Sequence, residues 1–228
     1  MGGGAELPLA VVALSGGLDS CVTTALAAQG NRLALLHVSY GQRTARRERR
    51  AFGDVADFYR VPPQRRLVAN MAYLARIGGS SLTDPYRDVP ATGALGRGVP
   101  NTYVPFRNTH ILTIAVSWAE VIGARRIYIG AVEQDSSGYP DCRRAYFDAF
   151  QQVVAEGTRP ETDVRIETPL IRMSKADIIR KGIELGAPLD LTWSCYRDED
   201  LACGKCESCV LRLRGFDAAG LADPIPYR

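Results

Sequence analysis

Short apolar runs alternate along this chain with longer stretches in which apolar residues recur every three or four positions. Short runs bounded by turn-forming residues are typical of buried strands, and the periodic stretches are typical of amphipathic helices. The runs that predict strands lie at residues 9–14, 33–38, 64–68, 126–131 and 164–167. Strands that alternate with helices predict an α/β fold, a doubly wound parallel five-stranded sheet with helices on both faces.

Helices are predicted at residues 21–29, 111–122 and 145–155, around the apolar positions 52–59, and after Ser174. Ser174 and Asp177 have the spacing of a capping box, which marks a helix start. By contrast, residues 78–100 are rich in Gly, Ser, Pro, Thr and Asp and show no sustained period. We expect a long loop there, either a lid or binding loop or a partly disordered segment.

Polar segments directly follow the predicted strands, at residues 15–20, 39–43, 130–144 and 168–175. Ligands of open parallel sheets bind beyond the carboxyl ends of the strands. We therefore expect these segments to form one site.

Residues 15–20 read Ser-Gly-Gly-Leu-Asp-Ser between the first strand and a helix. The glycines let backbone N–H groups approach a ligand, and a helix start adds unpaired N–H donors. Ser15 and Ser20 can donate hydroxyl hydrogen bonds to phosphate oxygens. Asp19 would repel a phosphate unless it caps the helix or holds Mg²⁺. The segment predicts a polyphosphate site, with an ordinary glycine-rich turn as the alternative.

This hexapeptide has neither the Gly-x-x-x-x-Gly-Lys-Ser/Thr pattern of a Walker loop nor Gly-x-Gly-x-x-Gly. It resembles the PP-loop, Ser-Gly-Gly-x-Asp-Ser, of the Rossmann-like ATP pyrophosphatases. That resemblance implies cleavage of ATP to AMP and pyrophosphate.

Four of the six cysteines lie close together, at Cys195, Cys203, Cys206 and Cys209. In a reducing compartment such a cluster is more typical of metal binding than of disulfides. Four thiolates suit tetrahedral Zn²⁺ and leave no open coordination position, which predicts a structural site. An iron–sulfur cluster is the alternative, although the ferredoxin spacing is absent. Of the other two, Cys21 is expected in the core, and Cys142 falls on the ligand side of the sheet.

The composition adds limits to this picture. The chain has 228 residues, of which 46% are hydrophobic and 23% charged, as is ordinary for a globular protein. We divide it into a nucleotide-binding domain at 1–190 and a C-terminal zinc-binding module at 191–228. The absence of a membrane-length apolar run and of a signal-peptide pattern predicts a cytoplasmic protein with no membrane partner.

The net charge of +3 is too small to predict nucleic-acid binding. The most basic segment is Arg43–Arg50, which leads into apolar positions with helical spacing. The arginines are therefore expected to form the solvated face of a helix, and a nucleic-acid patch is the alternative.

Several longer strings add a more specific resemblance. Together with the PP-loop and the cysteine cluster they resemble the 7-cyano-7-deazaguanine synthase (QueC) family from about Val11 to Gly215. These strings are Tyr-Gly-Gln-Arg at 40–43, Val-Pro-Phe-Arg-Asn at 104–108, Gly-Ala-Val-Glu-Gln-Asp-Ser-Ser-Gly-Tyr-Pro-Asp-Cys-Arg at 130–143 and Glu-Thr-Pro-Leu at 167–170.

The resemblance implies a ligase that uses ATP and Mg²⁺ to convert 7-carboxy-7-deazaguanine and ammonia into 7-cyano-7-deazaguanine, a queuosine precursor. It also implies one Zn²⁺ on the four cysteines, a homodimer, and small-molecule partners without nucleic acid. The ATP contacts that it implies are Leu14, Ser15, Gly16, Gly17, Leu18, Asp19, Ser20, Cys21, Val22, Thr23 and Thr24.

Two positions depart from the family pattern. Phe106 stands where the family often has glycine, and the loop at 130–135 differs from the frequent Gly-Val-Cys-Glu-Thr-Asp. The residues Arg107, Asn108, Glu133 and Asp135 are retained. We therefore expect these differences to affect the fit of the substrate and not the class of reaction.

The implied reaction needs positioning and charge stabilisation on the phosphates. The candidate catalytic residues are Asp19, which would aid Mg²⁺, with Arg107 and Lys175, which would neutralise the α-phosphate or the substrate carboxylate. Surface ion pairs are the alternative for the two cations. Tyr139 is predicted to stack on the heterocycle and Asp141 to accept from its guanine-like N–H edge. The full predicted substrate set is Arg107, Asp135, Tyr139, Asp141 and Arg143.

Three other functions stay open at this point. A PP-loop ligase or sulfur transferase could modify tRNA with the help of Arg43–Arg50. A related enzyme could join the activated deazaguanine to a protein amine instead of ammonia. A zinc-ribbon binding protein could carry a degenerate nucleotide loop, although the hexapeptide is intact.

Overall fold

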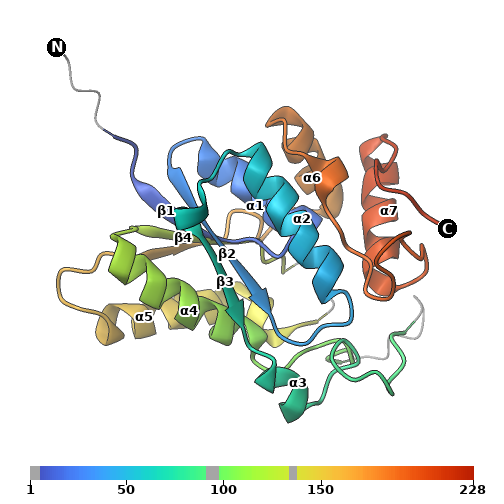
Figure 1. The fold of residues 1–228 in the computed structure, drawn as a ribbon, viewed down its shortest axis with the longest axis horizontal. Coiled ribbons are helices and arrows are strands. Elements are labelled where there is room, and N and C mark those ends of the chain that lie inside the picture. The colour runs from blue at the N-terminus through green and yellow to red at the C-terminus, as the bar shows by residue number, and fades with distance from the viewer. Residues whose placement is uncertain (1–5, 91–97, 134–137) are drawn as a thin grey trace.

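A five-stranded parallel sheet forms the centre of the computed structural model, which describes residues 6–90, 98–133 and 138–228 (Figure 1). The strands follow the order β3-β2-β1-β4-β5, and all neighbours are parallel. The prediction of a parallel five-stranded sheet is thus confirmed. The bounds are β1 (Leu9–Ala13), β2 (Arg32–Ser39), β3 (Arg66–Asn70), β4 (Arg126–Ile129) and β5 (Arg165–Glu167).

Helices cover both faces of this sheet because the central strands are apolar on both sides. One face buries Val11 and Leu36 against α4 and α5, and the other buries Val12 and Leu35 against α1, α2 and α6. Figure 1 shows α1 and α2 on the opposite side of the sheet from α4 and α5. The bounds are α1 (Leu18–Ala28), α2 (Ala45–Phe58), α3 (Tyr73–Ile77), α4 (Arg107–Ile122), α5 (Arg144–Gly157), α6 (Lys175–Glu184) and α7 (Glu207–Ala219).

The chain order places the site at the end of β1. From β1 the chain adds β2 and β3 outward on one side, then returns to place β4 and β5 on the other side of β1. Such a reversal opens a crevice at the carboxyl ends of the two central strands. The segments that follow β1 and β4 therefore face each other there.

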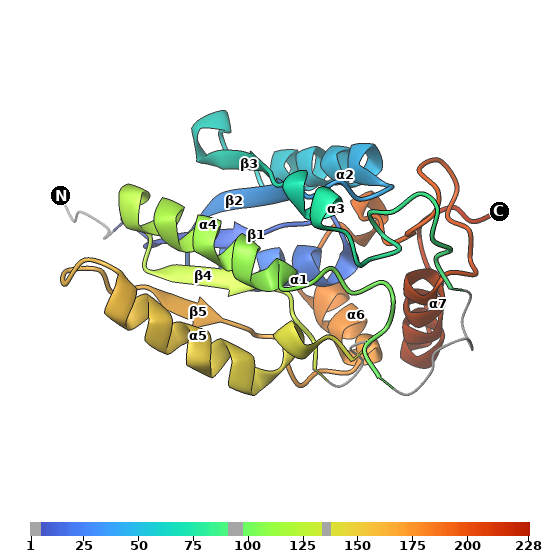
Figure 2. The same cartoon turned by 90° about the horizontal axis from the view of Figure 1, so that it is seen from below.

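Two helices were not predicted. The short α3 follows β3, and α7 follows the last cysteines and packs on α6. That packing is close, since a Cβ added to Gly215 would lie 2.3 Å from Lys175 Cγ. Figure 2 shows α6 and α7 beside each other at one end of the molecule. The division of the chain after residue 190 stays a prediction.

The predicted long loop includes residues 91–97, which lie outside the described residues. Its earlier part packs on the domain, because Leu82 and Val89 are buried and Ser81 N–H donates to Asn101 O at 2.8 Å. Elsewhere, Ser174 caps α6 by accepting from Asp177 N–H, as the capping box predicts. Within the described ranges, no helix is long and apolar enough to cross a membrane.

Candidate active site

The PP-loop turns sharply between β1 and α1. Gly16 has a φ of +92°, and an added Cβ there would lie 2.6 Å from the backbone oxygen of Glu48 on α2. Only glycine fits this conformation and this space. Trp193 N–H donates to Gly16 O at 2.8 Å, so the C-terminal segment also holds the loop.

The hydroxyl groups of the loop converge on the start of α1. Ser15 Oγ and Ser20 Oγ lie 3.0 Å apart, and Ser20 Oγ donates to Gly17 O at 2.9 Å. Among the described residues, no side chain caps α1, whose N-cap is Gly17. The first N–H groups of the helix are therefore free to bind an anion.

Asp19 and Lys175 form an ion pair across the loop. Lys175 Nζ lies 2.7 Å from each carboxylate oxygen of Asp19. The two side chains are partly buried, at 30% and 17% exposed respectively. The structure thus brings together two of the predicted catalytic residues at the PP-loop.

Arg107 starts α4 and lies among tyrosine rings. Its Nη1 donates to Tyr40 Oη at 3.0 Å, and its guanidinium lies 5.2 Å from the Tyr40 ring and 5.9 Å from the Tyr139 ring. Aromatic faces stabilise a cation there and leave the other N–H groups of the fork available. Arg107 is thus the predicted cation that lies among aromatic rings, whereas Lys175 pairs with Asp19.

One cavity of about 290 Å³ joins these groups. Asp19, Ser15 and Lys175 line it beside Arg107 and Tyr139. The C-terminal segment supplies further wall residues that were not predicted, namely Trp193, Ser194, Tyr196, Glu207, Ser208, Leu211 and Arg212. Tyr40 and Glu48 from the start of α2 and the loop before it also line the cavity.

Not every predicted nucleotide contact reaches this cavity. Leu14, Leu18 and Ser20 line the cavity. The residues from Cys21 to Thr24 belong to α1, and their side chains are buried in the protein away from the cavity. The Thr23 and Thr24 hydroxyls donate to backbone oxygens one turn earlier. These two threonines therefore bond to the first turn of their own helix, at Asp19 and Ser20.

Only some of the predicted substrate residues line the cavity. Tyr139 lines the cavity, and its hydroxyl donates to Thr102 Oγ1 at 2.8 Å. Asp141 is buried and accepts from Asn108 N–H at 2.9 Å, so its carboxylate caps the start of α4 instead of lining the cavity. Arg143 is exposed and also does not line it, and Asp135 lies outside the described residues.

Cys142 lines the cavity in surroundings that favour its neutral thiol form. Asn108 Nδ2 donates to its sulfur at 3.4 Å. Burial raises the pKa of Cys142 to about 11, and the neighbouring Asp141 charge acts in the same direction. A thiol with so high a pKa is a poor nucleophile at neutral pH.

Arginines of the Arg43–Arg50 segment contact other parts of the protein, although Arg46, Arg49 and Arg50 are exposed, as expected for a solvated helix face. Arg43 Nε donates to Ser81 O at 3.0 Å, and Arg46 Nε donates to Glu199 Oε2 at 2.8 Å. Arg47 lies over the Trp193 ring at 4.6 Å. These contacts tie α2 to the loops around the cavity.

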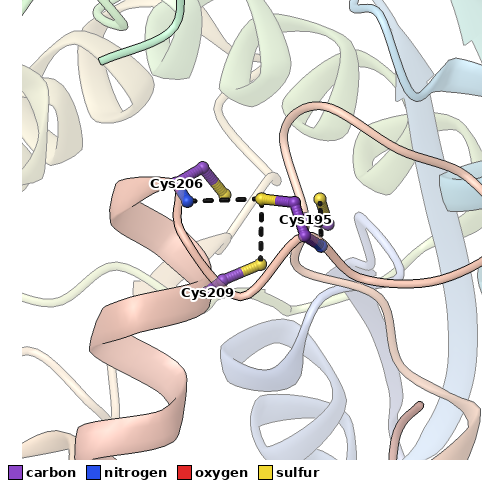
Figure 3. Close-up of side chains that lie close together, drawn as sticks. Cys195, Cys206 and Cys209 are labelled. Carbon is purple, nitrogen blue, oxygen red and sulfur yellow. Dashed lines mark hydrogen bonds between the residues drawn. The ribbon is translucent and has the colours of Figure 1, made fainter. Parts of the chain in front are cut away.

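The cysteine cluster is preformed. Cys195, Cys203, Cys206 and Cys209 are buried, and their sulfur atoms lie within 4.8 Å of one another. A tetrahedral Zn–S bond of about 2.3 Å requires sulfur atoms about 3.8 Å apart. Cys203 and Cys209 meet this requirement with a separation of 4.0 Å. Figure 3 shows Cys195, Cys206 and Cys209 directed toward one another.

Backbone N–H groups surround these sulfurs. Cys195 Sγ accepts from the N–H groups of Arg197, Asp198 and Cys203 at 3.3–3.5 Å. Cys203 Sγ accepts from Lys205 and Cys206. Such donors stabilise thiolates, so the cluster fits a structural metal.

A parallel α/β sheet with Ser-Gly-Gly-x-Asp-Ser at the end of its first strand defines a nucleotide-binding protein of the PP-loop class. A family model described as "Queuosine biosynthesis protein QueC" matches residues 9–220. The chain therefore belongs to the QueC family.

Two curated relatives agree with this family. The 7-cyano-7-deazaguanine synthase of Chlorobium phaeobacteroides is 59% identical over 219 residues, and that of Acidobacterium capsulatum is 56% identical over 222 residues. Each alignment covers 96% of this chain and 96% of the relative. Among solved structures, the U34-tRNA thiolase NcsA from Methanococcus maripaludis is 14% identical with a TM-score of 0.46, covering 80% of this chain and 59% of that one.

Proposed function

We propose that this chain is an ATP-dependent ligase that converts 7-carboxy-7-deazaguanine and ammonia into 7-cyano-7-deazaguanine. The observation that carries the proposal is the single cavity shared by the PP-loop and Arg107. Membership of the QueC family supports the choice of substrate. In this proposal, the PP-loop would bind the phosphates and Arg107 would bind the substrate carboxylate in the same cavity.

At the phosphate end, the free N–H groups of α1 and the hydroxyls of Ser15 and Ser20 would bind the pyrophosphate as it leaves. Asp19 would hold Mg²⁺, which screens the charge of the phosphates when bound. Lys175, released from Asp19, would then reach the α-phosphate, because its ammonium already lies beside the loop.

At the other end, Arg107 would bind the substrate carboxylate and orient one oxygen toward the α-phosphorus. Attack by that oxygen forms an acyl-adenylate and releases pyrophosphate. Ammonia then displaces AMP to give the amide. A second adenylation, on the amide oxygen, converts that oxygen into a leaving group, and loss of AMP yields the nitrile.

Recognition of the heterocycle would rest on the tyrosine side of the cavity. Tyr139 is our candidate for stacking, since it is buried against the cavity and near Arg107. Asp135, Asp141 and Arg143 stay predicted substrate residues. Asp141 would act through α4, whose first turn it caps, because its carboxylate faces Asn108.

We further propose Zn²⁺ as the metal of the cysteine cluster. Four buried thiolates with backbone donors suit a closed tetrahedral site, in which the metal crosslinks residues 195–209 and does not meet substrate. Thiols that must stay reduced to bind a metal also favour a cytoplasmic location.

We propose a homodimer and no nucleic-acid partner. An apolar groove on the outer face of α4, lined by Leu67, Ile114, Trp118 and Val121, supports the dimer. Val121 is 77% exposed in the single chain. The internal pairing of Arg43, Arg46 and Arg47 supports the absence of nucleic acid.

The test of this function is mass spectrometry of the products formed from the deazaguanine acid, ATP and ammonia. We expect the amide as an intermediate and the nitrile as the product, with AMP and pyrophosphate released. Formation of ADP and phosphate, or transfer of the deazaguanine to a protein amine with no free nitrile, would contradict the proposal.

A further inference from the structure

Glu48 is a carboxylate in the cavity wall that the sequence did not single out. It lies in the first turn of α2, whose backbone packs directly on Gly16 of the PP-loop. Its side chain lines the same cavity as Arg107 and Tyr40. A negative group therefore stands close to the place where the substrate carboxylate would be activated.

Two donors fix the orientation of this carboxylate. Gln42 Nε2 donates to Glu48 Oε2 at 2.9 Å, and Thr44 Oγ1 donates to Oε1 at 2.8 Å. Gln42 is itself held, because its Oε1 accepts from Tyr40 N–H at 2.8 Å. A carboxylate has about four lone-pair sites, so the clamp leaves capacity on both oxygens for a ligand.

Arg107 acts on the same group from α4. Its charge favours the ionised form of Glu48, as do the donors Gln42 and Thr44. Burial is the largest effect and raises the pKa of Glu48. The remaining acidic neighbour, Glu199, also raises it. A carboxylate whose pKa is shifted upward in a cavity is suited to accept a proton.

The proposed reaction must release protons inside this cavity. When ammonia displaces AMP, a C–N bond forms, the C–O bond to AMP breaks, and the nitrogen must lose a proton. When the adenylated amide becomes a nitrile, the second C–O bond breaks and the nitrogen loses its N–H protons. Ammonia also arrives mostly as ammonium, which must give up a proton before it can attack.

We propose that Glu48 binds the ammonium ion and accepts the protons that nitrogen releases in the amide-forming and nitrile-forming steps. Each proton passes from nitrogen to a carboxylate oxygen of Glu48 and then to solvent, and AMP takes the electron pair of the broken C–O bond. This role rests on the proposed function. It differs from a role in adenylation, which consumes no ammonia.

The other carboxylates of the cavity wall, as far as the structure describes it, fit this role less well. Asp19 is bonded to Lys175 by both oxygens. Glu207 lies on α7 with a long bond from Thr102 Oγ1 at 3.5 Å, next to the metal ligand Cys206. The carboxylate of Glu48, by contrast, accepts two short hydrogen bonds and also interacts with the charge of Arg107.

The test separates adenylation from the ammonia steps. Exchange of labelled pyrophosphate into ATP, in the presence of the deazaguanine acid, measures the first adenylation without ammonia. For E48Q we expect amide formation from ammonium to fall by about 100-fold or more, while exchange falls less than about threefold. Hydroxylamine, which is largely uncharged at neutral pH, should restore trapping of the acyl-adenylate by E48Q.

The matched control is D54N, which changes a carboxylate on the same helix that does not line the cavity and should keep the wild-type ratio of the two rates. A second variant, T44V, keeps Glu48 but removes one donor. It should raise the pKa of Glu48 and shift the pH profile of amide formation upward without changing exchange.

An equal loss of exchange and amide formation in E48Q, or the same selective loss in D54N, would overturn the role of Glu48. So would an unshifted T44V profile, which remains measurable if E48Q does not fold. Absence of exchange in the wild-type protein would instead contradict the proposed function.

Discussion

The two ends of the cavity are built in different ways. The phosphate end is made by one hexapeptide, from backbone N–H groups and the short side chains of residues 15–20. The opposite end is made by side chains from distant segments, among them Tyr40, Arg107 and Tyr139. The proposed phosphate chemistry would thus reside in one local motif, whereas the proposed substrate contacts depend on how distant segments of the chain pack together.

The C-terminal segment that carries the cysteine cluster also builds the cavity, because Trp193 N–H donates to Gly16 O and Glu207 lines the cavity wall. Removing the metal should therefore have the largest effect. We expect C206S to lose the metal and about 3 kcal/mol or more of unfolding free energy, with a fall in the melting temperature of about 6–12 °C. Elemental analysis and thermal unfolding measure both.

The control for this variant is C142S, which changes another buried cysteine outside the cluster. It should keep the metal. Loss of the metal with wild-type melting in C206S would show that the fold does not depend on the ion, and full metal content would show that Cys206 is not a required ligand. Iron in place of zinc would contradict the proposed metal.

The next largest effect should come from the phosphate end. D19N removes the partner of Lys175 and the proposed Mg²⁺ ligand, so pyrophosphate exchange should fall by about 100-fold to 1,000-fold. D19N combined with K175A should lose little more than either single change, because the two groups act together. Exposed Asp177 supplies the control, D177N. Independent, multiplying losses would argue against a shared role.

A smaller and more selective effect is expected at the opposite end. R107K keeps the charge but loses the planar fork, so KM for the deazaguanine acid should rise by about 10-fold to 100-fold. KM for ATP should change by less than about threefold. If both constants rise together, Arg107 binds phosphate, and the two ends of the cavity are not separate.

The smallest effect concerns the residue before Arg107. Phe106 has a φ of +60° and is 56% exposed, so its ring contributes little packing to offset the left-handed backbone. F106G should stabilise the protein by about 0.5–1 kcal/mol in denaturant unfolding, because glycine adopts this conformation without strain. A loss of stability would show that the phenylalanine ring is needed for packing.

This difference between the ends also explains what the sequence could predict. The PP-loop and the four cysteines were found because their function depends on short spacing along the chain. The wall residues Glu48 and Trp193 were missed, since their roles arise only when α2 and the C-terminal segment pack on Gly16.

Helix α7 was missed for a related reason. It buries Arg212, which pairs with Asp223 at 2.8 Å, so a charged residue interrupts the apolar pattern that marks a buried face. Asp141 shows that the type of a residue alone does not determine its role. A carboxylate can read a base or cap a helix, and only the contact with Asn108 N–H reveals that this one caps α4.

The most direct test of the proposed mechanism measures where the carboxylate oxygen atoms of the substrate go during the reaction. With the deazaguanine acid labelled by ¹⁸O in both carboxylate oxygens, each adenylation should transfer one labelled oxygen to AMP. We predict two AMP molecules for each nitrile formed, each with one ¹⁸O, and unlabelled pyrophosphate. Unlabelled AMP, or label in pyrophosphate or phosphate, would show that the carboxylate is not activated at the α-phosphate and would contradict this mechanism.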